Sequence, residues 1–334
     1  MEEILYLVVP CYNEEEVLIE TSKRLLGKIN KMINEEKISK KSKILFVNDG
    51  SKDKTWDMIE ELYNKNSIFS GVNLSRNRGH QNALLAGLMV AKEYADMVIS
   101  LDADLQDDID VIEKFVEEYY SGSDIVYGVR SSRKTDTFFK RTTALGFYKL
   151  MDKLGVNVVY NHADYRLMSK RALEALAEFK EVNLFLRGIV PLIGYKYSIV
   201  EYERHERFAG ESKYPLKKML AFAIDGITSF SVKPIRLISV LGFSIFFISL
   251  IALIYSLVVK FLGKTEVGWT SIVISIWMLG GIQLLSLGVI GEYIGKIYNE
   301  TKARPRYIIK DKLIRNKEEK INEYYKQNKK YIYK

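Results

Sequence analysis

The sequence predicts an α/β protein with a doubly wound, mostly parallel sheet, followed by an interfacial helix and two transmembrane helices. In the first half of the 334-residue chain, short β-branched and aromatic runs alternate with longer amphipathic stretches. Polar residues cluster directly after several of those runs. Farther along, the chain contains two long stretches without any charged residue. The alternation in the first half is typical of a sheet that is covered by helices on both faces.

Strands are predicted where a short apolar run is bounded by polar or turn-forming residues. Five such runs lie in the first half of the chain, at residues 4–9, 43–47, 71–74, 97–101 and 124–127. Helices are predicted between them, at residues 14–34, 52–63, 81–93 and 108–120. Residues 162–176 predict a short turn followed by a helix over 167–176, and residues 195–202 alternate like a strand.

Four polar segments follow predicted strands. They are PCYNE at residues 10–14, NDGS at 48–51, SRNRG at 75–79 and DAD at 102–104. Ligands of open α/β sheets bind at the carboxyl ends of the strands, so these segments predict a site at one edge. No G-x-G-x-x-G follows the first strand and no G-x-x-x-x-G-K-[ST] occurs, so neither a dinucleotide-binding fold nor a P-loop is supported.

Asp102 and Asp104 stand two residues apart at the end of the predicted fourth strand. The strand repeat of two points both carboxylates the same way, where they repel each other unless a cation lies between them. Oxygen ligands beside a diphosphate favour Mg²⁺ or Mn²⁺. The alternative is a loop that caps the next helix, which accounts better for Asp107, Asp108 and Asp110.

Two uncharged stretches, residues 238–259 and 269–290, are each long enough to cross a hydrocarbon core of about 30 Å. Two buried helices of a soluble core are the alternative, but long core helices normally carry a polar stripe. From residue 296 onward, thirteen Lys and Arg stand against five Asp and Glu, and this excess of eight equals the formal charge of +8. The basic tail predicts cytoplasmic termini, and nucleic-acid binding is not expected because no reading motif accompanies the charge.

Charged residues before the first apolar stretch have two interpretations. Arg204, Arg207 and Lys213 flank Gly210, and they form either a solvated face or a mobile loop that binds phosphate.

Asp164 is either the N-cap of the helix at 167–176 or a partner of Arg166, or it has a catalytic role. His80 and His162 are expected to form hydrogen bonds or to pack in loops, because two distant histidines make no metal site. A disulfide within the chain is excluded, because Cys11 is the only cysteine.

Seven segments resemble, in order, the conserved blocks of family 2 glycosyltransferases of the GT-A fold. They are VVPCYNEEE, VNDGSKDKT, LSRNRGHQNALLAG, SLDADLQDD, ADYRLMSKRA, RFAGESKY and GEYIGKIYNETKARPRY. The resemblance extends to about residue 307 and is to the polyprenyl-phosphate sugar synthases, which include dolichyl-phosphate mannose synthase and bacterial undecaprenyl-phosphate glucosyltransferases. No QxxRW motif is present and only two apolar stretches follow, so the chain departs from processive polysaccharide synthases.

The resemblance implies roles for individual residues. The nucleoside of a nucleotide-sugar donor would be held by Pro10, Tyr12, Glu14 and Asp49. Asp102 would contact its ribose or phosphate region, and Asp104 would hold Mg²⁺ or Mn²⁺ on the diphosphate. Asp164 matches the position proposed for the catalytic base. The donor or acceptor phosphates would lie near Arg130, Arg133, Arg204 and Lys213, with Arg207 in the same loop as the last two.

The resemblance also implies an activity: inverting transfer of one sugar, with UDP-glucose preferred, to a membrane polyprenyl phosphate. N-acetylated sugars, galactose and GDP-mannose remain open, as do another glycolipid or glycan acceptor and a non-catalytic, membrane-tethered nucleotide-sugar binding protein. The expected domains are a cytoplasmic catalytic domain at 1–213, an amphipathic interfacial region at 214–234, two transmembrane helices within 235–295 and a basic cytoplasmic tail at 296–334. The expected location is a bacterial-type cytoplasmic membrane, and the glycine-containing spans permit a homo-oligomer.

Overall fold

The computed structural model describes residues 2–131, 162–203, 233–262 and 268–315. The chain forms two compact units. The sheet unit comprises the described parts of Met1–Leu145, Val158–Lys213 and Pro305–Lys334, and the helical unit contains the described parts of Tyr214–Arg304. Each unit is taken by itself below.

The sheet unit is built on one mixed sheet of eight strands, in the order β7-β5-β6-β4-β1-β2-β3-β8. The strands are β1 (Leu5–Cys11), β2 (Lys43–Asn48), β3 (Phe69–Leu74), β4 (Met97–Ser100), β5 (Ile125–Arg130), β6 (His162–Ser169), β7 (Tyr197–Tyr202) and β8 (Ile309–Leu313). The pairs β1–β2, β1–β4, β2–β3 and β5–β7 are parallel, whereas β6 and β8 pair antiparallel with their neighbours. The five strands predicted in the first half, and the strand predicted at 195–202, are confirmed.

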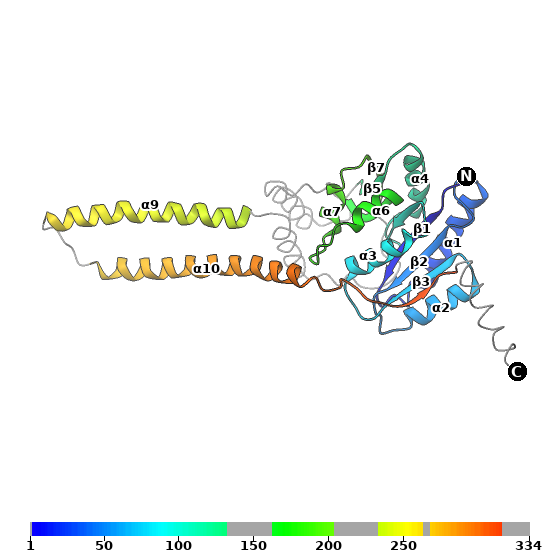
Figure 1. Cartoon of the computed structure of the whole chain (residues 1–334), viewed down its shortest axis with the longest axis horizontal. Coiled ribbons are helices and arrows are strands. Elements are labelled where there is room, and N and C mark those ends of the chain that lie inside the picture. The colour runs from blue at the N-terminus through cyan, green and yellow to red at the C-terminus, as the bar shows by residue number, and fades with distance from the viewer. Residues whose placement is uncertain (1, 132–161, 204–232, 263–267, 316–334) are drawn as a thin grey trace. The chain divides into compact units, whose positions relative to one another are not determined.

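Helices lie on both faces of this sheet (Figure 1). They are α1 (Leu18–Asn34), α2 (Thr55–Lys65), α3 (His80–Ala91), α4 (Ile112–Tyr120), α6 (Lys170–Ala177) and α7 (Leu186–Leu192), with a 3₁₀ turn η1 (Ile109–Val111) before α4. On one face, apolar residues of α1 and α4 pack with Leu5, Leu7 and Val9 of β1. On the other, α3 lies against β1 and β2 at Gly87, beside Val8 and Val47. The predicted doubly wound arrangement is therefore confirmed.

The prediction of a turn and a helix over 162–176 was wrong in its first half. Residues 162–169 form β6, which lies between β4 and β5, and the helix begins only at Lys170. The residues from Tyr165 to Ser169 are all buried, because both faces of a central strand are covered. Such a strand shows no alternation of polar and apolar residues, so periodicity cannot distinguish it from a buried helix.

A second unpredicted strand, β8, lies within the stretch expected to be a basic tail. It pairs antiparallel with β3 and forms one edge of the sheet. Asn73 Nδ2 donates to Asp311 Oδ2 at 2.9 Å, and the backbone N–H of Ser75 donates to the carbonyl of Ile308 at 2.9 Å. Just beyond β8, the Arg315 guanidinium lies 4.8 Å from the centre of the Tyr63 ring. The chain that follows the last long helix thus covers the β3 edge, which would otherwise offer open hydrogen-bonding groups.

The helical unit contains α9 (Lys233–Phe261) and α10 (Trp269–Lys302), which contact each other (Figure 1). Within the described residues, Met278–Lys302 is long and apolar enough to cross a membrane, judged by length and composition, and Ile235–Ile245 is a shorter apolar stretch. The predicted spans fall inside these two helices. One candidate span is therefore found, and a pair of spans stays a prediction.

Gly87 offers a test of how closely α3 packs on the sheet. A Cβ at this position would lie 2.4 Å from Val8 Cγ1 and 2.6 Å from Val47 Cγ2, so Gly87→Ala should lower the free energy of unfolding by about 1–3 kcal/mol through overpacking. Gly27→Ala in α1 is the matched control, because nothing lies within 4 Å of its Cβ, and it should be neutral or stabilise by about 0.5–1 kcal/mol. Thermal unfolding of both variants measures the difference, and equal unfolding temperatures would contradict the close packing.

Candidate active site

The carboxyl ends of β1, β2 and β4 lie side by side and form the carboxyl edge of the sheet, as predicted for parallel neighbours. Because β6 is antiparallel to β4, its first residues reach the same edge. Ser100, the last residue of β4, pairs with Arg166, and its hydroxyl donates to the carbonyl of Asp164. Asp164 therefore lies beside the DAD segment although 60 residues separate them in sequence.

Asp102 and Asp104 lie in the loop after β4 rather than in the strand, which ends at Ser100. The strand repeat from which a common direction of the two carboxylates was predicted therefore does not extend to them. The Asp102 side chain is 40% exposed, whereas Asp104 is buried and its Oδ1 accepts a hydrogen bond from the backbone N–H of Gln106 at 3.1 Å. Leu105, which follows Asp104, adopts a positive φ of 57°, which is strained for a residue with a branched side chain.

His80 joins two of the carboxylates. It is the first residue of α3, and its Nε2 lies 3.6 Å from Asp102 Oδ1 and 3.8 Å from Asp164 Oδ2. We expected only hydrogen bonding or loop packing from this histidine, and sequence reasoning missed its place in the site. The available signal was its position just after the SRNRG segment, at the start of a helix that opens at the carboxyl edge of the sheet.

Asp164 is held between two guanidinium groups. Arg166 Nη2 donates to its Oδ1 at 2.6 Å, and Arg187 Nη2 donates to its Oδ2 at 3.1 Å. Burial by itself would raise the pKa of Asp164, but the charges of Arg187 and Arg166 outweigh it and lower the pKa well below its usual value. This carboxylate therefore remains ionised and is a weak proton acceptor.

The alternatives stated for Asp164 are now resolved in part. Its pairing with Arg166 is confirmed. A role as helix N-cap is wrong, because Ser169 caps α6 by accepting from the N–H of Ala172 at 3.2 Å. Arg187, in α7, was not predicted, since nothing in the sequence connects it to a position 23 residues earlier.

The ends of β1 and β2 are bound to each other and to the loop before α3. Asp49 accepts backbone hydrogen bonds from Arg78 at 2.7 Å and Gly79 at 2.9 Å. Burial raises the pKa of Asp49, and these two bonds partly offset that effect. Gly50 has a φ of 63° and lies so close to the Arg76 backbone that a Cβ would be 2.5 Å from its carbonyl carbon. Asp49 thus shapes the 75–79 loop.

The segment that contains Pro10, Tyr12 and Glu14 lies next to these residues. Pro10 is buried in β1 beside Val47, and Tyr12 is 41% exposed. The backbone N–H of Glu14 donates to Thr55 Oγ1 at 2.9 Å. The four residues expected to hold a nucleoside therefore come together, although their contacts with a nucleoside stay a prediction.

Asp107 is buried at the same edge, where Tyr202 donates to its Oδ1 at 2.6 Å and Arg130 Nη2 at 3.4 Å. Burial, followed by the negative charge of Asp102, raises the pKa of Asp107 to about 6, and Arg130 and Tyr202 partly oppose this. The capping interpretation is confirmed for Asp108, which caps η1. It does not describe Asp107, whose carboxylate faces Arg130.

Several predicted phosphate ligands lie outside the described residues. They are Arg133, Arg204, Arg207 and Lys213. Arg130 is described, and it contacts Asp107 and Tyr202. In the described part of the chain, no three His, Cys, Asp or Glu side chains come together as metal ligands.

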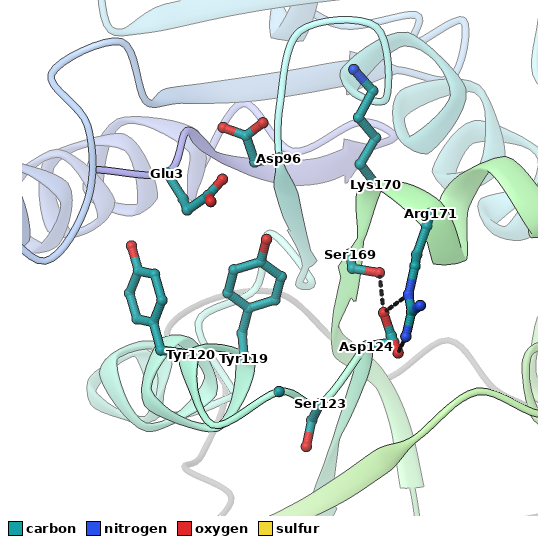
Figure 2. Close-up of a pocket in the computed structure, with 10 residues that line it drawn as sticks. Glu3, Asp96, Tyr119, Tyr120, Ser123, Asp124, Ser169, Lys170 and Arg171 are labelled. Atoms are coloured by element: carbon teal, nitrogen blue, oxygen red, sulfur yellow. Dashed lines mark hydrogen bonds and ion pairs between the residues drawn. The ribbon is translucent and has the colours of Figure 1, made fainter. Parts of the chain in front are cut away.

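A cavity of about 410 Å³ lies at the amino ends of the parallel strands, and Figure 2 shows residues that line it. Its lining includes Glu3 and Asp96, which precede β1 and β4, and Asp124, which precedes β5. Arg171 and Ser169 both bind Asp124 there. This cavity is therefore at the amino ends of the parallel strands and is separate from the candidate site.

A mixed, mostly parallel sheet with acidic loops at the carboxyl ends of its parallel strands is an α/β fold in which ligands bind at those ends. Residues 6–177 match the family described as Glycosyl transferase family 2. The chain is 60% identical to the uncharacterized glycosyltransferase YkoT of Bacillus subtilis, over 92% of this chain and 91% of that protein. This chain belongs to glycosyltransferase family 2.

Two further relatives are similar over nearly the same length. The bactoprenol glucosyl transferase of Shigella phage SfX is 40% identical, over 92% of this chain and 98% of that protein. The prophage bactoprenol glucosyl transferase homolog of Escherichia coli is 41% identical, over 91% of this chain and 97% of that protein. The similarity therefore includes the part of the chain beyond residue 177.

The environment of Asp164 leads to a stability prediction. Asp164→Asn leaves two guanidinium groups without their shared anion, so it should lower the free energy of unfolding by about 3 kcal/mol. Because the pKa of Asp164 is lowered, its stabilising effect is present above the usual carboxyl pKa of about 4 and is lost only at more acidic pH. The loss in Asp164→Asn should therefore be the same throughout the neutral range.

Thermal unfolding of the full chain in detergent, repeated at several pH values near neutrality, measures this effect. Asp110→Asn is the matched control, because that side chain is 83% exposed and pairs with Lys28 at the surface end of η1. Lys28 keeps its ion pair with Glu113 at 2.6 Å when the exposed Asp110 carboxylate is removed, so the loss should be at most about 1 kcal/mol. Equal unfolding temperatures for the two variants would contradict the assigned role of Asp164.

Proposed function

We propose that this protein transfers a single sugar from a nucleoside-diphosphate sugar, with UDP-glucose preferred, to a membrane polyprenyl phosphate. The observation that carries the proposal is the similarity, at 40–41% identity over more than nine-tenths of the chain, to proteins named as bactoprenol glucosyl transferases. The carboxylates at the carboxyl edge of the sheet support this proposal, because oxygen ligands suit a divalent cation on a diphosphate. The apolar Met278–Lys302 segment supports access to a lipid acceptor.

In this proposal, the nucleoside of the donor lies against Pro10, Tyr12, Glu14 and Asp49. Asp49 supports this assignment because it fixes the backbone of the adjacent 75–79 loop. Asp102, the more exposed of the two DAD carboxylates, would contact the ribose or phosphate region. The phosphates of donor and acceptor would be bound by Arg130, Arg133, Arg204, Arg207 and Lys213.

A divalent cation fits the oxygen donors of the DAD loop. Mg²⁺ is commonly held by one or two carboxylates together with substrate phosphates, rather than by an all-protein cage. Asp104, with Asp102 two residues away, offers this kind of partial site, and no larger cluster of ligands is present in the described residues. Asp104 would hold Mg²⁺ or Mn²⁺, which would stabilise the negative charge of the leaving diphosphate.

Inverting transfer requires the acceptor phosphate to approach the anomeric carbon from the face opposite the diphosphate. A phosphate oxygen forms the new bond to carbon while the bond to the diphosphate oxygen breaks, and the nucleoside diphosphate leaves with that electron pair. The second pKa of a phosphate monoester is near 6, so the acceptor is mostly dianionic at neutral pH and need not lose a proton.

The state of Asp164 agrees with this chemistry. Its pKa is lowered by two arginines, so it is a poor general base. It keeps Arg187 at the site, where this side chain is 31% exposed and can contact an anion. We therefore assign Asp164 an orienting role, in which it places Arg187 and His80 beside the reacting groups.

The membrane arrangement is part of the proposal. Residues 235–295 would form two transmembrane helices after an interfacial segment, with the catalytic part and both termini on the cytoplasmic side. The basic residues after α10 support a cytoplasmic C-terminus. This arrangement brings the donor site to the leaflet from which a polyprenyl phosphate presents its headgroup.

A transfer assay tests the proposal. Purified full-length protein is mixed with radiolabelled UDP- and GDP-sugars and undecaprenyl phosphate, with Mg²⁺, Mn²⁺ or EDTA. We expect label to enter the organic phase from one donor, to require a metal ion and to be released by mild acid. Binding of nucleotide sugars without label in lipid would contradict the acceptor, and label in a polymer would favour another glycosyl acceptor.

The metal role has its own variant. Asp104→Asn removes the charge expected to hold the cation, so it should reduce turnover by at least about a hundredfold while the fold is retained. Asp110→Asn serves again as control, because it removes an exposed carboxylate six residues away that faces Lys28. Normal, EDTA-sensitive turnover in Asp104→Asn would show that another residue holds the metal.

A further inference from the structure

Two tyrosine hydroxyls hold the end of the loop that carries Asp102 and Asp104. Tyr202, the last residue of β7, donates to the carboxylate of Asp107 at 2.6 Å. Tyr165, in β6, donates to the backbone carbonyl of Asp108 at 2.9 Å. The two rings pack edge to face, with centroids 5.3 Å apart. The loop therefore begins at the end of β4, and its far end is hydrogen-bonded to residues of β6 and β7.

Asp107 is the point where these strands meet the loop. Arg130, at the end of β5, reaches Asp107 with Nη2 and the Tyr202 hydroxyl with Nε at 3.3 Å. The backbone N–H of Ser131 donates to the carbonyl of Tyr202 at 2.9 Å. The ends of β5 and β7 and the DAD loop are thus joined through one buried carboxylate.

This arrangement makes the ionisation of Asp107 unfavourable, so a role in supporting the fold alone explains the buried carboxylate poorly. The side chain is only 4% exposed, and the charges of Asp102 and Asp104 on its own loop oppose its ionisation. Arg130 and the Tyr202 hydroxyl favour the anion but offset the cost only in part. The hydroxyl of Tyr165, which faces the same region, donates to Asp108 instead. Capping of η1 does not require Asp107 either, because Asp108 performs it.

The connection from Asp107 to the metal-binding position is short. Only two residues separate Asp107 from Asp104, and the intervening loop contains the strained Leu105. Backbone strain of this kind persists only where surrounding contacts impose it. Loss of the hydrogen bond between Tyr202 and Asp107 should therefore shift the backbone at Asp104 and Asp102 as well.

We propose that Tyr202 and Asp107 are positioning residues, which hold the DAD loop in its donor-binding geometry while Asp107 is ionised and release it when Asp107 is protonated. The proposal rests on the proposed function, because it assigns the loop to a nucleotide-sugar donor. It makes donor binding weaken at acidic pH, where Asp107 becomes protonated and Tyr202 and Arg130 lose their anionic partner.

Donor binding is a cleaner readout than turnover. The acceptor phosphate itself titrates near pH 6, so it gives the transfer rate an acid limb of its own. The diphosphate of a nucleotide sugar is a diester with no second ionisation in that range. The dissociation constant of UDP-glucose is therefore measured calorimetrically with Mn²⁺ at a series of pH values on either side of 6, using the full chain in detergent.

Tyr202→Phe is the diagnostic variant. It removes a hydrogen bond that favours the Asp107 anion, so the pKa of Asp107 should rise and the loss of donor affinity should move to higher pH. A residue that only supported the fold would weaken binding equally at all pH values. Tyr197→Phe is the matched control, because it lies on the same strand beside the start of β5 and is 58% exposed. It should leave the pH profile of the wild-type protein unchanged.

Asp107→Asn provides the second variant. It keeps an acceptor oxygen for Tyr202 but cannot ionise, so the loss of affinity at acidic pH should disappear, with donor binding weaker by about tenfold at neutral pH. Parallel profiles for the wild-type protein and Tyr202→Phe, with lipid transfer intact, would overturn this inference alone. Donor binding with the expected shift but no lipid transfer would overturn the proposed acceptor alone. Failure of every nucleotide sugar to bind would overturn both.

Discussion

Negative charge concentrated at one edge of the sheet is the constraint on which the rest of the site depends. Each carboxylate there is stabilised by a different device. Asp164 has two guanidinium groups, Asp49 has two backbone amides, and Asp107 has Tyr202 and Arg130. Asp102 is the most exposed of the group, with His80 nearby. The arginines and the 75–79 loop each contact one of these carboxylates, and His80 lies near two of them.

The first strands could be predicted because local patterns produce them. Short apolar runs that end in polar segments give parallel strands, and the carboxyl ends of parallel neighbours coincide, so the DAD, NDGS and PCYNE segments were expected together. β6 could not be recognised, because a central strand buried on both faces lacks alternation. β8, with the sequence IKDKL, has the charged composition of a solvated tail, and only its pairing with β3 makes it a strand.

Site residues were missed for the same reason. His80 begins the helix after β3, and Arg187 lies in α7, beyond the helix that follows β6; only the fold brings them within reach of Asp164. Tyr202 and Asp107 are 95 residues apart and were not connected by any motif. Sequence blocks identify which segments reach the edge. They do not identify which charged side chains form pairs, because this depends on the positions of the antiparallel strand β6 and the parallel strand β7 in the sheet.

The helices of the second unit lie, in the sequence, between the two strands at the lateral edges of the sheet. α9 and α10 follow β7 and precede β8, and these two strands form the opposite edges of the sheet. The helical unit is therefore an insertion between two edge strands. β8 contacts the chain that leads into the 75–79 loop, and β7 ends at the Tyr202 that holds the DAD loop. In chain order, the helical unit therefore stands between the strand that ends at Tyr202 and the strand that pairs with β3.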